Sequence, residues 1–231
     1  FPLPATERTV AHVLRAARNY STAFVGKWGL GYNGTTGEPW RHGVDHFFGF
    51  LDQAQAHNYY PPHMWRNAQH VPYAANEGAS RARCMAPGND CEYAPSHMLA
   101  EATRRLARLA EPFFLIYSPI PPHAGGWHGI DETGAPVPDN DAYAAQRGRW
   151  PDVEVDHAAT VTTYVDAQLR ALLDTLDARG AAVRNNTLVL FVSDNGAHAE
   201  GGHDVHFFNS TGGLRGYKRS LYEGGIRTPA V

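Results

Sequence analysis

The stretch LVLFVSDNG, residues 188–196, decides the fold. Five apolar residues lead directly to Asp194 and Asn195, and a short apolar run of this kind predicts a buried strand. Because Asp, Asn and Gly are the commonest turn formers, the polar end is compatible with an ordinary turn. It is also the pattern of a ligand site at the carboxyl edge of a parallel sheet, where open α/β folds bind ligands.

Similar short apolar runs occur at 21–25 and 113–117, and helical patterns separate the three runs. Periodicity predicts helices over 6–19, capped by Thr6, and over 96–110 and 156–179. Their predicted buried faces are Val10, Val13, Leu14 and Ala17; Leu99, Ala102, Leu106 and Leu109; and Val161, Val165, Leu169, Leu172 and Leu176. Strands joined through long helical crossovers predict an α/β fold, a mostly parallel sheet with helices on both faces.

Residues 31–95 form a long segment rich in Gly, Pro, His, Tyr and Asn, without a clear period. An excursion of this length is usually a functional loop, so we expect a substrate-side loop region here. Loop aromatics that could stack on sugar rings are Tyr59, Tyr60, Trp65 and, further along, Trp127. Cys84 and Cys91 predict a short disulfide loop in an exported protein and two free thiols otherwise.

The bulk composition suits one sizeable globular domain or a large part of one, with 231 residues of which 43% are hydrophobic. A formal net charge of −3 gives no indication of a nucleic-acid or acidic-membrane partner. No apolar run approaches the roughly 18 residues that span a bilayer. The chain begins without Met or a signal segment and ends in an apolar element, so we interpret it as incomplete at both ends.

Polar side chains follow each predicted strand at its carboxyl end: Lys27, then His123, then Asp194 with Asn195. Parallel strand ends share one edge, so these residues should converge there, and Lys218 follows closely in the chain. Each alone has an ordinary explanation as a surface lysine or a turn residue. Together they predict an anion site in which the carboxylate and amide hold Ca²⁺, or alternatively Mg²⁺.

Five motifs appear in a fixed order: GKWGLG (26–31), GVDHFFGF (43–50), EPFFLIYSPIPPH (111–123), SDNG (193–196) and LRGYKRSLYEGGIRTP (214–229). In this order they resemble the sulfatases of the alkaline-phosphatase superfamily, over nearly the whole chain. SDNG followed by G-x-K-x-x-x-x-E-G-G-x-R-x-P is the specific part of the resemblance. The stretch AHNYYPPHMWRN, 56–67, is similar to a branch of arylsulfatase-like enzymes found in bacteria that degrade sulfated polysaccharides.

The resemblance implies a role for each matching residue. Asp194 and Asn195 match calcium ligands, and Lys27 matches the lysine that bridges the nucleophile and the sulfate. His123 and Lys218 match residues that bind sulfate oxygens and assist the leaving alcohol. The loop behind Lys218 matches a structural signature formed by Glu223, Gly224, Gly225 and Arg227.

Two departures from the family pattern stand out. The family nucleophile is a formylglycine made in a C-x-P/A-x-R motif, but Cys84 has Gly88 where Arg is required and follows the GKW motif instead of preceding it. We therefore expect the nucleophile, and an Asp pair that completes the calcium shell, upstream of this chain, which alone should be inactive. Gly29 stands where many relatives carry a histidine that helps eliminate sulfate; His57 or His63 could reach in, and His57 is the expected substrate contact.

Two alternative functions stay open. A phosphodiesterase or phosphonate hydrolase of the same superfamily would use imidazole-rich transition-metal sites, for which the candidate residues are His198, His203, Asp204 and His206. Substrate contacts or solvent exposure are the preferred interpretation of those histidines. A non-catalytic carbohydrate-binding remnant is the second alternative. The expected partner is a small-molecule or glycan sulfate ester, in a secreted, periplasmic or lysosome-like location.

Overall fold

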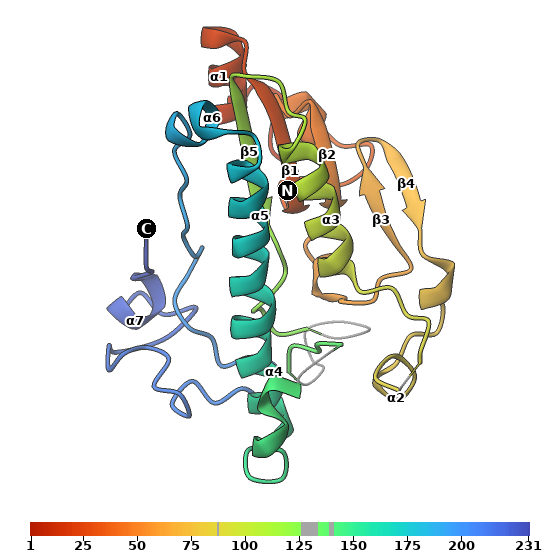
Figure 1. The fold of residues 1–231 in the computed structure, drawn as a ribbon, viewed down its shortest axis with the longest axis vertical. Coiled ribbons are helices and arrows are strands. Elements are labelled where there is room, and N and C mark those ends of the chain that lie inside the picture. The colour runs from red at the N-terminus through yellow and green to blue at the C-terminus, as the bar shows by residue number, and fades with distance from the viewer. Residues whose placement is uncertain (87, 126–133, 139–140) are drawn as a thin grey trace.

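A five-stranded mixed sheet in the order β4-β3-β2-β1-β5 forms the centre of the fold (Figure 1). The computed structural model describes residues 1–86, 88–125, 134–138 and 141–231. Two parallel pairings join β1 to its neighbours, and an antiparallel hairpin extends the sheet on one side. The strands are β1 (Ser21–Lys27), β2 (His46–Phe50), β3 (His63–Arg66), β4 (Gln69–Pro72) and β5 (Phe113–Ser118).

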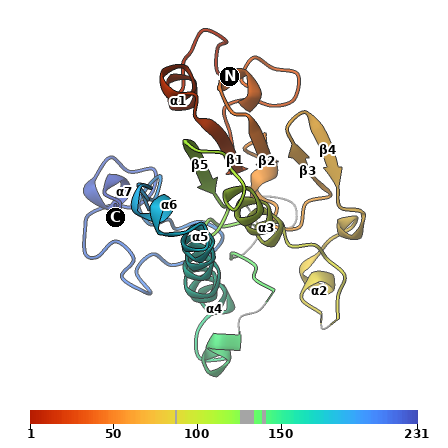
Figure 2. The ribbon, with the colours of Figure 1, turned by 45° about the horizontal axis from the view of Figure 1, so that its top comes forward.

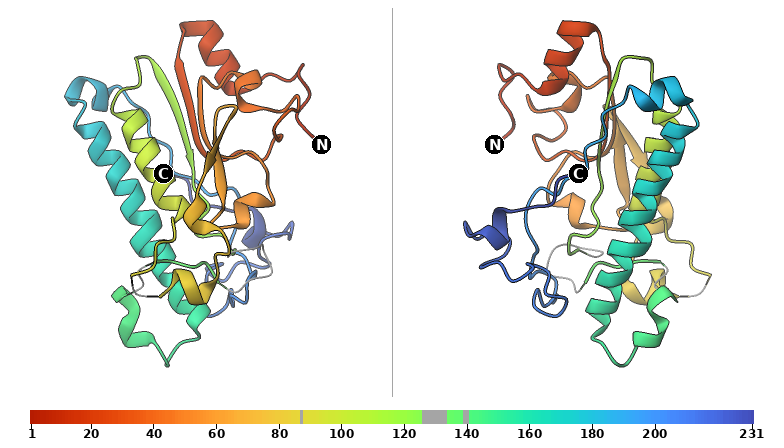
Figure 3. Two further views of the ribbon diagram at one scale, coloured as in Figure 1. Left: turned by 90° about the vertical axis from the view of Figure 1, so that its right-hand side faces the viewer. Right: turned by 60° about the vertical axis from the view of Figure 1, so that its left-hand side comes forward.

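Helices cover both faces of this sheet, which confirms the predicted α/β class. Helix α1 (Val10–Arg18) lies on one face, while α3 (Ala94–Leu106) and α5 (Ala167–Asp177) lie on the other (Figures 2 and 3). The shorter helical elements are η1 (Pro39–His42), η2 (Gln55–His57), η3 (Ala74–Asn76), α2 (Arg81–Cys84), η4 (Asp141–Gln146), α4 (Asp152–Ala159), η5 (Thr160–Asp166), α6 (Ala181–Asn185) and α7 (Glu223–Ile226). Within the described part of the chain, no helix is long and apolar enough to cross a membrane.

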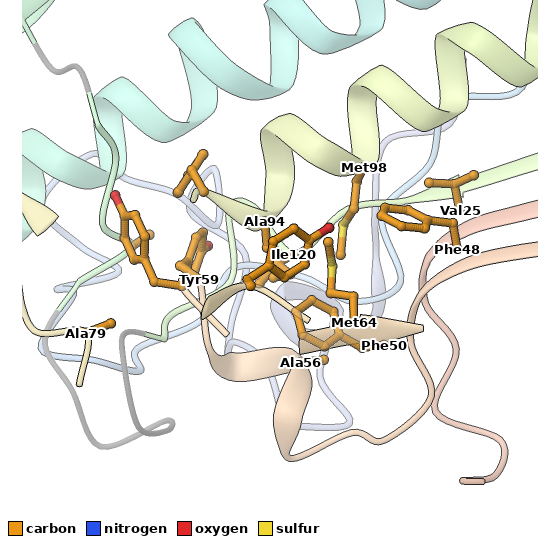
Figure 4. Close-up of a cluster of buried hydrophobic side chains, with 14 of the residues drawn as sticks. Val25, Phe48, Phe50, Ala56, Tyr59, Met64, Ala79, Ala94, Met98 and Ile120 are labelled. Carbon is orange, nitrogen blue, oxygen red and sulfur yellow. The ribbon is translucent and has the colours of Figure 1, made fainter. Parts of the chain in front are cut away.

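The larger core cluster lies between the sheet and α3 (Figure 4). Val25 and Phe48 from neighbouring strands pack there with Met98 of α3. Tyr59 and Tyr60 are 0% and 1% exposed in this core, so the prediction that they stack on sugar rings is wrong. Burial of these rings from the segment after β2 anchors that segment to the sheet. Trp65 packs against the second core cluster, and Trp127 lies outside the described residues.

Helix α1 is shorter and turned differently from the prediction. It begins at Val10, and its cap is Thr9, whose hydroxyl accepts from the His12 amide. Thr9 also donates to the carbonyl of His42, which ties the helix start to η1. This attachment directs Ala11 toward the sheet and leaves Val10 and Val13 about half exposed, at 53% and 52%.

The segment 31–95 is more regular than its composition suggests. It contains three of the five strands, and β2 is buried at every position. The sequence of β2, His-Phe-Phe-Gly-Phe, does not alternate between polar and apolar residues because both faces of the strand are buried. The alternation that usually identifies a strand is therefore missing. The expectation of an irregular loop over this whole range is therefore wrong. The same segment contains the Cys84–Cys91 disulfide, which confirms the predicted disulfide loop.

The predicted helix over 156–179 is interrupted in its middle. Thr160–Asp166 forms a π-helical stretch between α4 and α5. A π-helical turn accommodates one more residue than an α-helical turn. The residues that follow it are therefore rotated about the helix axis relative to an uninterrupted α-helix. Val161 is consequently exposed and Gln168 is buried, whereas Leu176 is buried as predicted. Gln168 satisfies its buried amide by accepting from the Tyr117 hydroxyl of β5 at 2.9 Å.

The apolar run 188–192 is not a strand of the sheet, so this part of the prediction is wrong. Its regular pairing is limited to a single bridge between Val192 and Ala230, flanked by two backbone bonds between Phe191 and Val231 of 2.8 and 3.0 Å. All five side chains are exposed, Leu188 at 82% and Leu190 at 70%. No described strand pairs with this segment along its length, so its apolar side chains are not covered as those of a central strand are.

Candidate active site

Side chains from both halves of the chain meet at the carboxyl end of the parallel strands. Lys27 is the last residue of β1, His57 ends η2 after β2, and His123 follows β5. Lys218 reaches the same place from the C-terminal stretch, where its Nζ lies 2.6 Å from His123 Nε2. Lys27, His123 and Lys218 therefore lie together at the edge where the strand-end argument places them, and His57 lies beside His123.

The core holds His123 in place. The buried Tyr59 hydroxyl donates to the His123 carbonyl at 2.6 Å, and the His57 ring packs edge-on against the His123 ring at 4.9 Å between centroids. His123 Nδ1 lies 2.5 Å from the Ala124 carbonyl, which can only accept, so this nitrogen carries the ring proton. Nε2 then accepts from the Lys218 ammonium. Burial, with the Lys218 and Lys27 charges adding to it, lowers the pKa of His123 to about 4, so the ring is neutral at pH 7.

Glu200 is a functional-site residue that the sequence did not reveal. Its Oε2 lies 2.8 Å from Lys218 Nζ and 3.2 Å from His123 Nε2, and its Oε1 lies 2.7 Å from the Arg219 guanidinium. Burial alone would raise the pKa of Glu200, but the bond and charge of Lys218, with His123 and Arg219, lower it. A lone Glu in a Gly-rich stretch carries no pattern; its position between SDNG and Lys218 was the available signal.

Lys27 lies within electrostatic range of the C-terminal site residues. Burial lowers the pKa of Lys27, and the Lys218 ammonium lowers it further, whereas Asp194 and Glu200 act in the opposite direction. The pKa of His57 is lowered chiefly by burial, with Lys27 and Lys218 contributing. The site therefore combines two ammonium groups with two neutral imidazoles, which suits an anionic ligand.

Close backbone packing attaches the C-terminal motifs to each other. A Cβ on Gly196 would lie 2.0 Å from the Gly224 carbonyl oxygen. The two backbone segments could therefore not pack this closely if position 196 carried a side chain. The Gly196 amide donates to the Gly225 carbonyl at 3.0 Å, and the Lys218 amide donates to the Ala197 carbonyl at 2.7 Å. These contacts explain physically why SDNG and the Glu-Gly-Gly segment occur together, and they place Lys218 beside Ala197, which directly follows SDNG.

Among the described residues, the histidines that follow SDNG belong to no group that could hold a metal ion, and of His198, His203 and His206 only His206 is exposed. His198 and His203 are 9% and 5% exposed, so the expectation of solvent-exposed side chains is wrong for these two. His203 Nδ1 lies 2.7 Å from the Glu154 carboxylate of α4, and the His157 ring stacks on the His203 ring at 3.9 Å. His198 Nε2 lies 3.3 Å from the Pro122 carbonyl, next to His123. They connect the C-terminal stretch to α4 and to the segment after β5.

The side-chain amide of Gln53 lies next to Gly29, the position where many relatives carry a histidine. Gly29 has a left-handed backbone, with φ of 75°, and a Cβ there would lie 3.1 Å from Gln53 Oε1. An amide does not act as a base at neutral pH, so Gln53 is no chemical substitute for a histidine. His57 is the imidazole that packs against His123, whereas His63 stacks on His70 in the β3–β4 hairpin.

The predicted cation ligands lie at the same end of the sheet but do not make a complete site in this chain. Asp194 is exposed, Asn195 is partly buried, and Asp194 lies within electrostatic range of Lys27. Among the described residues, no group of three or more His, Cys, Asp or Glu side chains could hold a metal ion. The oxygen donors of Asp194 and Asn195 fit a hard cation such as Ca²⁺, which takes about six to eight oxygen ligands. Any cation here needs further ligands.

The family model described as Sulfatase matches residues 1–231. Among curated relatives, arylsulfatase A of Homo sapiens is 30% identical over 247 residues, covering 99% of this chain and 43% of the relative. N-acetylgalactosamine-6-sulfatase of Sus scrofa is 29% identical, covering 99% of this chain and 40% of the relative. The chain thus spans less than half the length of these curated relatives.

Solved structures share the fold at low identity. The structure titled "Crystal structure of Ps i-CgsB in complex with k-i-k-neocarrahexaose" matches with a TM-score of 0.68 and 20% identity, covering 100% of this chain and 48% of the other. The structure of BT4656 in complex with D-glucosamine-2-N,6-O-disulfate matches with a TM-score of 0.62 and 18% identity, covering 100% and 56%. At this identity the likeness concerns the fold alone.

Proposed function

The chain belongs to the sulfatase family, and we propose that the longer protein to which it corresponds hydrolyses sulfate esters with the site described above. One observation carries the proposal: the Lys218 ammonium bonds to both His123 and Glu200 at the strand ends, beside Lys27. Positive charge held in a partly buried site stabilises a sulfate group and the charge that develops as its ester bond breaks.

Each residue has a proposed role that follows from its contacts. Lys27 binds sulfate oxygens through its ammonium group, and Lys218 contacts the sulfate ester oxygen that leaves with the alcohol. His123 is neutral with its proton on Nδ1, so its Nε2 orients Lys218 and does not donate to sulfate. The proton that the leaving alcohol needs then comes from Lys218. His57 lines the substrate side of His123.

Asp194 and Asn195 are the proposed ligands of Ca²⁺, or alternatively of Mg²⁺. The cation would supply positive charge that binds and polarises the sulfate group. The attacking formylglycine and the remaining ligands are proposed to lie in the part of the longer protein upstream of Phe1.

Two oxygen ligands are too few for tight binding, so we expect this chain alone to bind Ca²⁺ weakly. Titration calorimetry of the 231-residue chain measures this directly. Tight Zn²⁺ binding would instead favour the phosphodiesterase alternative, for which His198, His203, Asp204 and His206 are the candidate ligands.

The proposed substrate class is a sulfate ester of a carbohydrate or an aryl alcohol. Two observations support it: relatives include an arylsulfatase and an N-acetylgalactosamine-6-sulfatase, and two proteins of the same fold are described in complex with a neocarrahexaose and with a sulfated glucosamine. The Cys84–Cys91 disulfide supports an exported, periplasmic or lysosome-like location, since disulfides persist in oxidising compartments.

The deciding experiment uses the complete protein with three substrates: 4-nitrophenyl sulfate, a sulfated sugar and bis(4-nitrophenyl) phosphate. We expect inorganic sulfate release, measured by ion chromatography, to exceed cleavage of the phosphodiester. Faster cleavage of the phosphodiester would favour the phosphodiesterase alternative. Sugar binding without turnover of any substrate would favour a non-catalytic binding protein.

A further inference from the structure

Glu200 is an unexpected neighbour for an anion site, because a carboxylate repels a sulfate group. Its side chain is only 14% exposed, and both of its oxygens are occupied by basic groups. Oε2 contacts Lys218 and His123, and Oε1 contacts Arg219, at 2.7 to 3.2 Å. An enclosed carboxylate in this position needs a structural or chemical reason.

The hydrogen bonds of the Lys218 ammonium give that reason. A lysine ammonium has three N–H donors at tetrahedral angles. One points to Glu200 Oε2 at 2.8 Å and one to His123 Nε2 at 2.6 Å. His123 is limited to accepting there, because its Nδ1–H is directed to the Ala124 carbonyl. Two fixed acceptors set the rotation of the ammonium group, which leaves a single N–H in a defined direction.

The residue after Lys218 is held by the same carboxylate. Arg219 has φ of 76°, a left-handed conformation that non-glycine residues rarely adopt. Its guanidinium pairs with Glu200 Oε1 at 2.7 Å, and the Lys218 amide donates to the Ala197 carbonyl at 2.7 Å. The backbone and the side chain of Lys218 are thus both fixed from the segment that carries Glu200.

We propose that Glu200 is a positioning residue that, together with His123, aims the remaining N–H of Lys218 at the oxygen of the leaving alcohol. This inference rests on the proposed sulfate-ester hydrolysis. In the step concerned, an oxygen nucleophile bonds to sulfur while the bond between sulfur and the alcohol oxygen breaks. The electron pair stays on the alcohol oxygen, which takes the proton from Lys218 Nζ. Neutral Lys218 then regains a proton from water.

The dependence on the leaving group separates this role from a general effect on structure. A sugar alcohol is a strongly basic leaving group and needs the proton, whereas 4-nitrophenolate leaves without one. In the complete protein, we expect Glu200→Ala to lower kcat for a sugar sulfate about 100-fold, within the usual range of general acid catalysis. For 4-nitrophenyl sulfate we expect a fall of only a few-fold, and similar KM values for both substrates.

Two further variants make the test specific. Glu200→Gln keeps an acceptor oxygen but loses the charge, so its kcat for the sugar sulfate should lie between those of wild type and Glu200→Ala. Glu111→Gln also removes the charge of an ion-paired carboxylate, here from its 3.0 Å pair with Arg179 away from the site, and should leave both rates unchanged. If Glu200→Ala lowers the melting temperature, the comparison is made with Glu200→Gln.

Equal loss of kcat for both substrates in a folded variant, or no loss for either, would overturn the role of Glu200 while leaving the proposed function intact. If the wild-type complete protein releases sulfate from neither substrate, the proposed function and the role of Glu200 fail together.

Discussion

The sheet and the C-terminal stretch, residues 186–231, each supply half of the site, and they are built in opposite ways. Lys27 ends β1 and His123 follows β5. Side chains of the sheet are buried in two core clusters. Lys218 and Glu200 belong to a stretch whose apolar run is exposed and whose attachments are backbone bonds, close glycine contacts and buried polar pairs. The first half is stabilised by packing, and the second by directional contacts both within itself and to the rest of the chain.

The largest expected effect is on stability, in a direct comparison of the two halves. Phe50→Ala removes a ring with 0% exposure from the sheet and should lower the free energy of unfolding of this chain by about 3 to 5 kcal/mol. Leu190→Ala, at 70% exposure, should change it by no more than about 0.5 kcal/mol. Denaturant unfolding of the two variants measures the difference. Equal costs would show that the C-terminal stretch has a core of its own.

The next effect concerns the attachment between the halves. Glu154 of α4 accepts from His203 Nδ1 and from the Asp204 amide, both at 2.7 Å, and Glu154 is 1% exposed. Glu154→Ala should cost about 3 kcal/mol, because a buried imidazole and a partly buried backbone amide lose their partner. Denaturant unfolding measures the cost, and hydrogen exchange should show faster exchange of the Asp204 amide. Retained stability with unchanged exchange would mean that this pair does not hold the stretch.

The smallest of these effects is the pH dependence of the same attachment. Burial, with His203 and His198 adding to it, lowers the pKa of His157 from 6.5 to about 3. Such a histidine binds a proton more readily when unfolded, so stability is complete above pH 6.5 and falls as the pH decreases. Between pH 6.5 and 5, His157→Phe should reduce this loss by about 1 kcal/mol, measured by unfolding at each pH. An identical pH profile for wild type and variant would contradict the assignment.

Sequence patterns predicted the structure correctly where local composition or periodicity determines it. They failed where contacts between residues far apart in the sequence determine it. The runs that became β1 and β5 were recognised by their apolar character, and the position of Lys27 at a strand end followed from it. Strand β2 has no alternation and was missed. Residues 188–192 have the composition of a buried strand but no partner strand in the described chain, so their composition was misleading.

Within the site, Lys218 and His123 could be predicted because motif order and strand ends placed them on one edge. Glu200 could not, because its role depends on three basic groups that come from two other segments, one containing His123 and one containing Lys218 and Arg219. Tyr59 was assigned to substrate contact from its residue type, whereas its burial and its bond to the His123 carbonyl make it a support of the site. Both outcomes depend on tertiary contacts that a local pattern does not contain.

The most direct test of a site assembled from the two halves is the turnover of a sulfated sugar by the complete protein carrying Lys218→Ala. We expect kcat to fall about 10² to 10³-fold, as for other losses of one preorganised charged contact. The melting temperature should fall little in comparison, because Glu200 keeps its ion pair with Arg219 when Lys218 is removed. Wild-type turnover in this variant, at an unchanged melting temperature, would contradict the assignment of Lys218 and with it the proposed site.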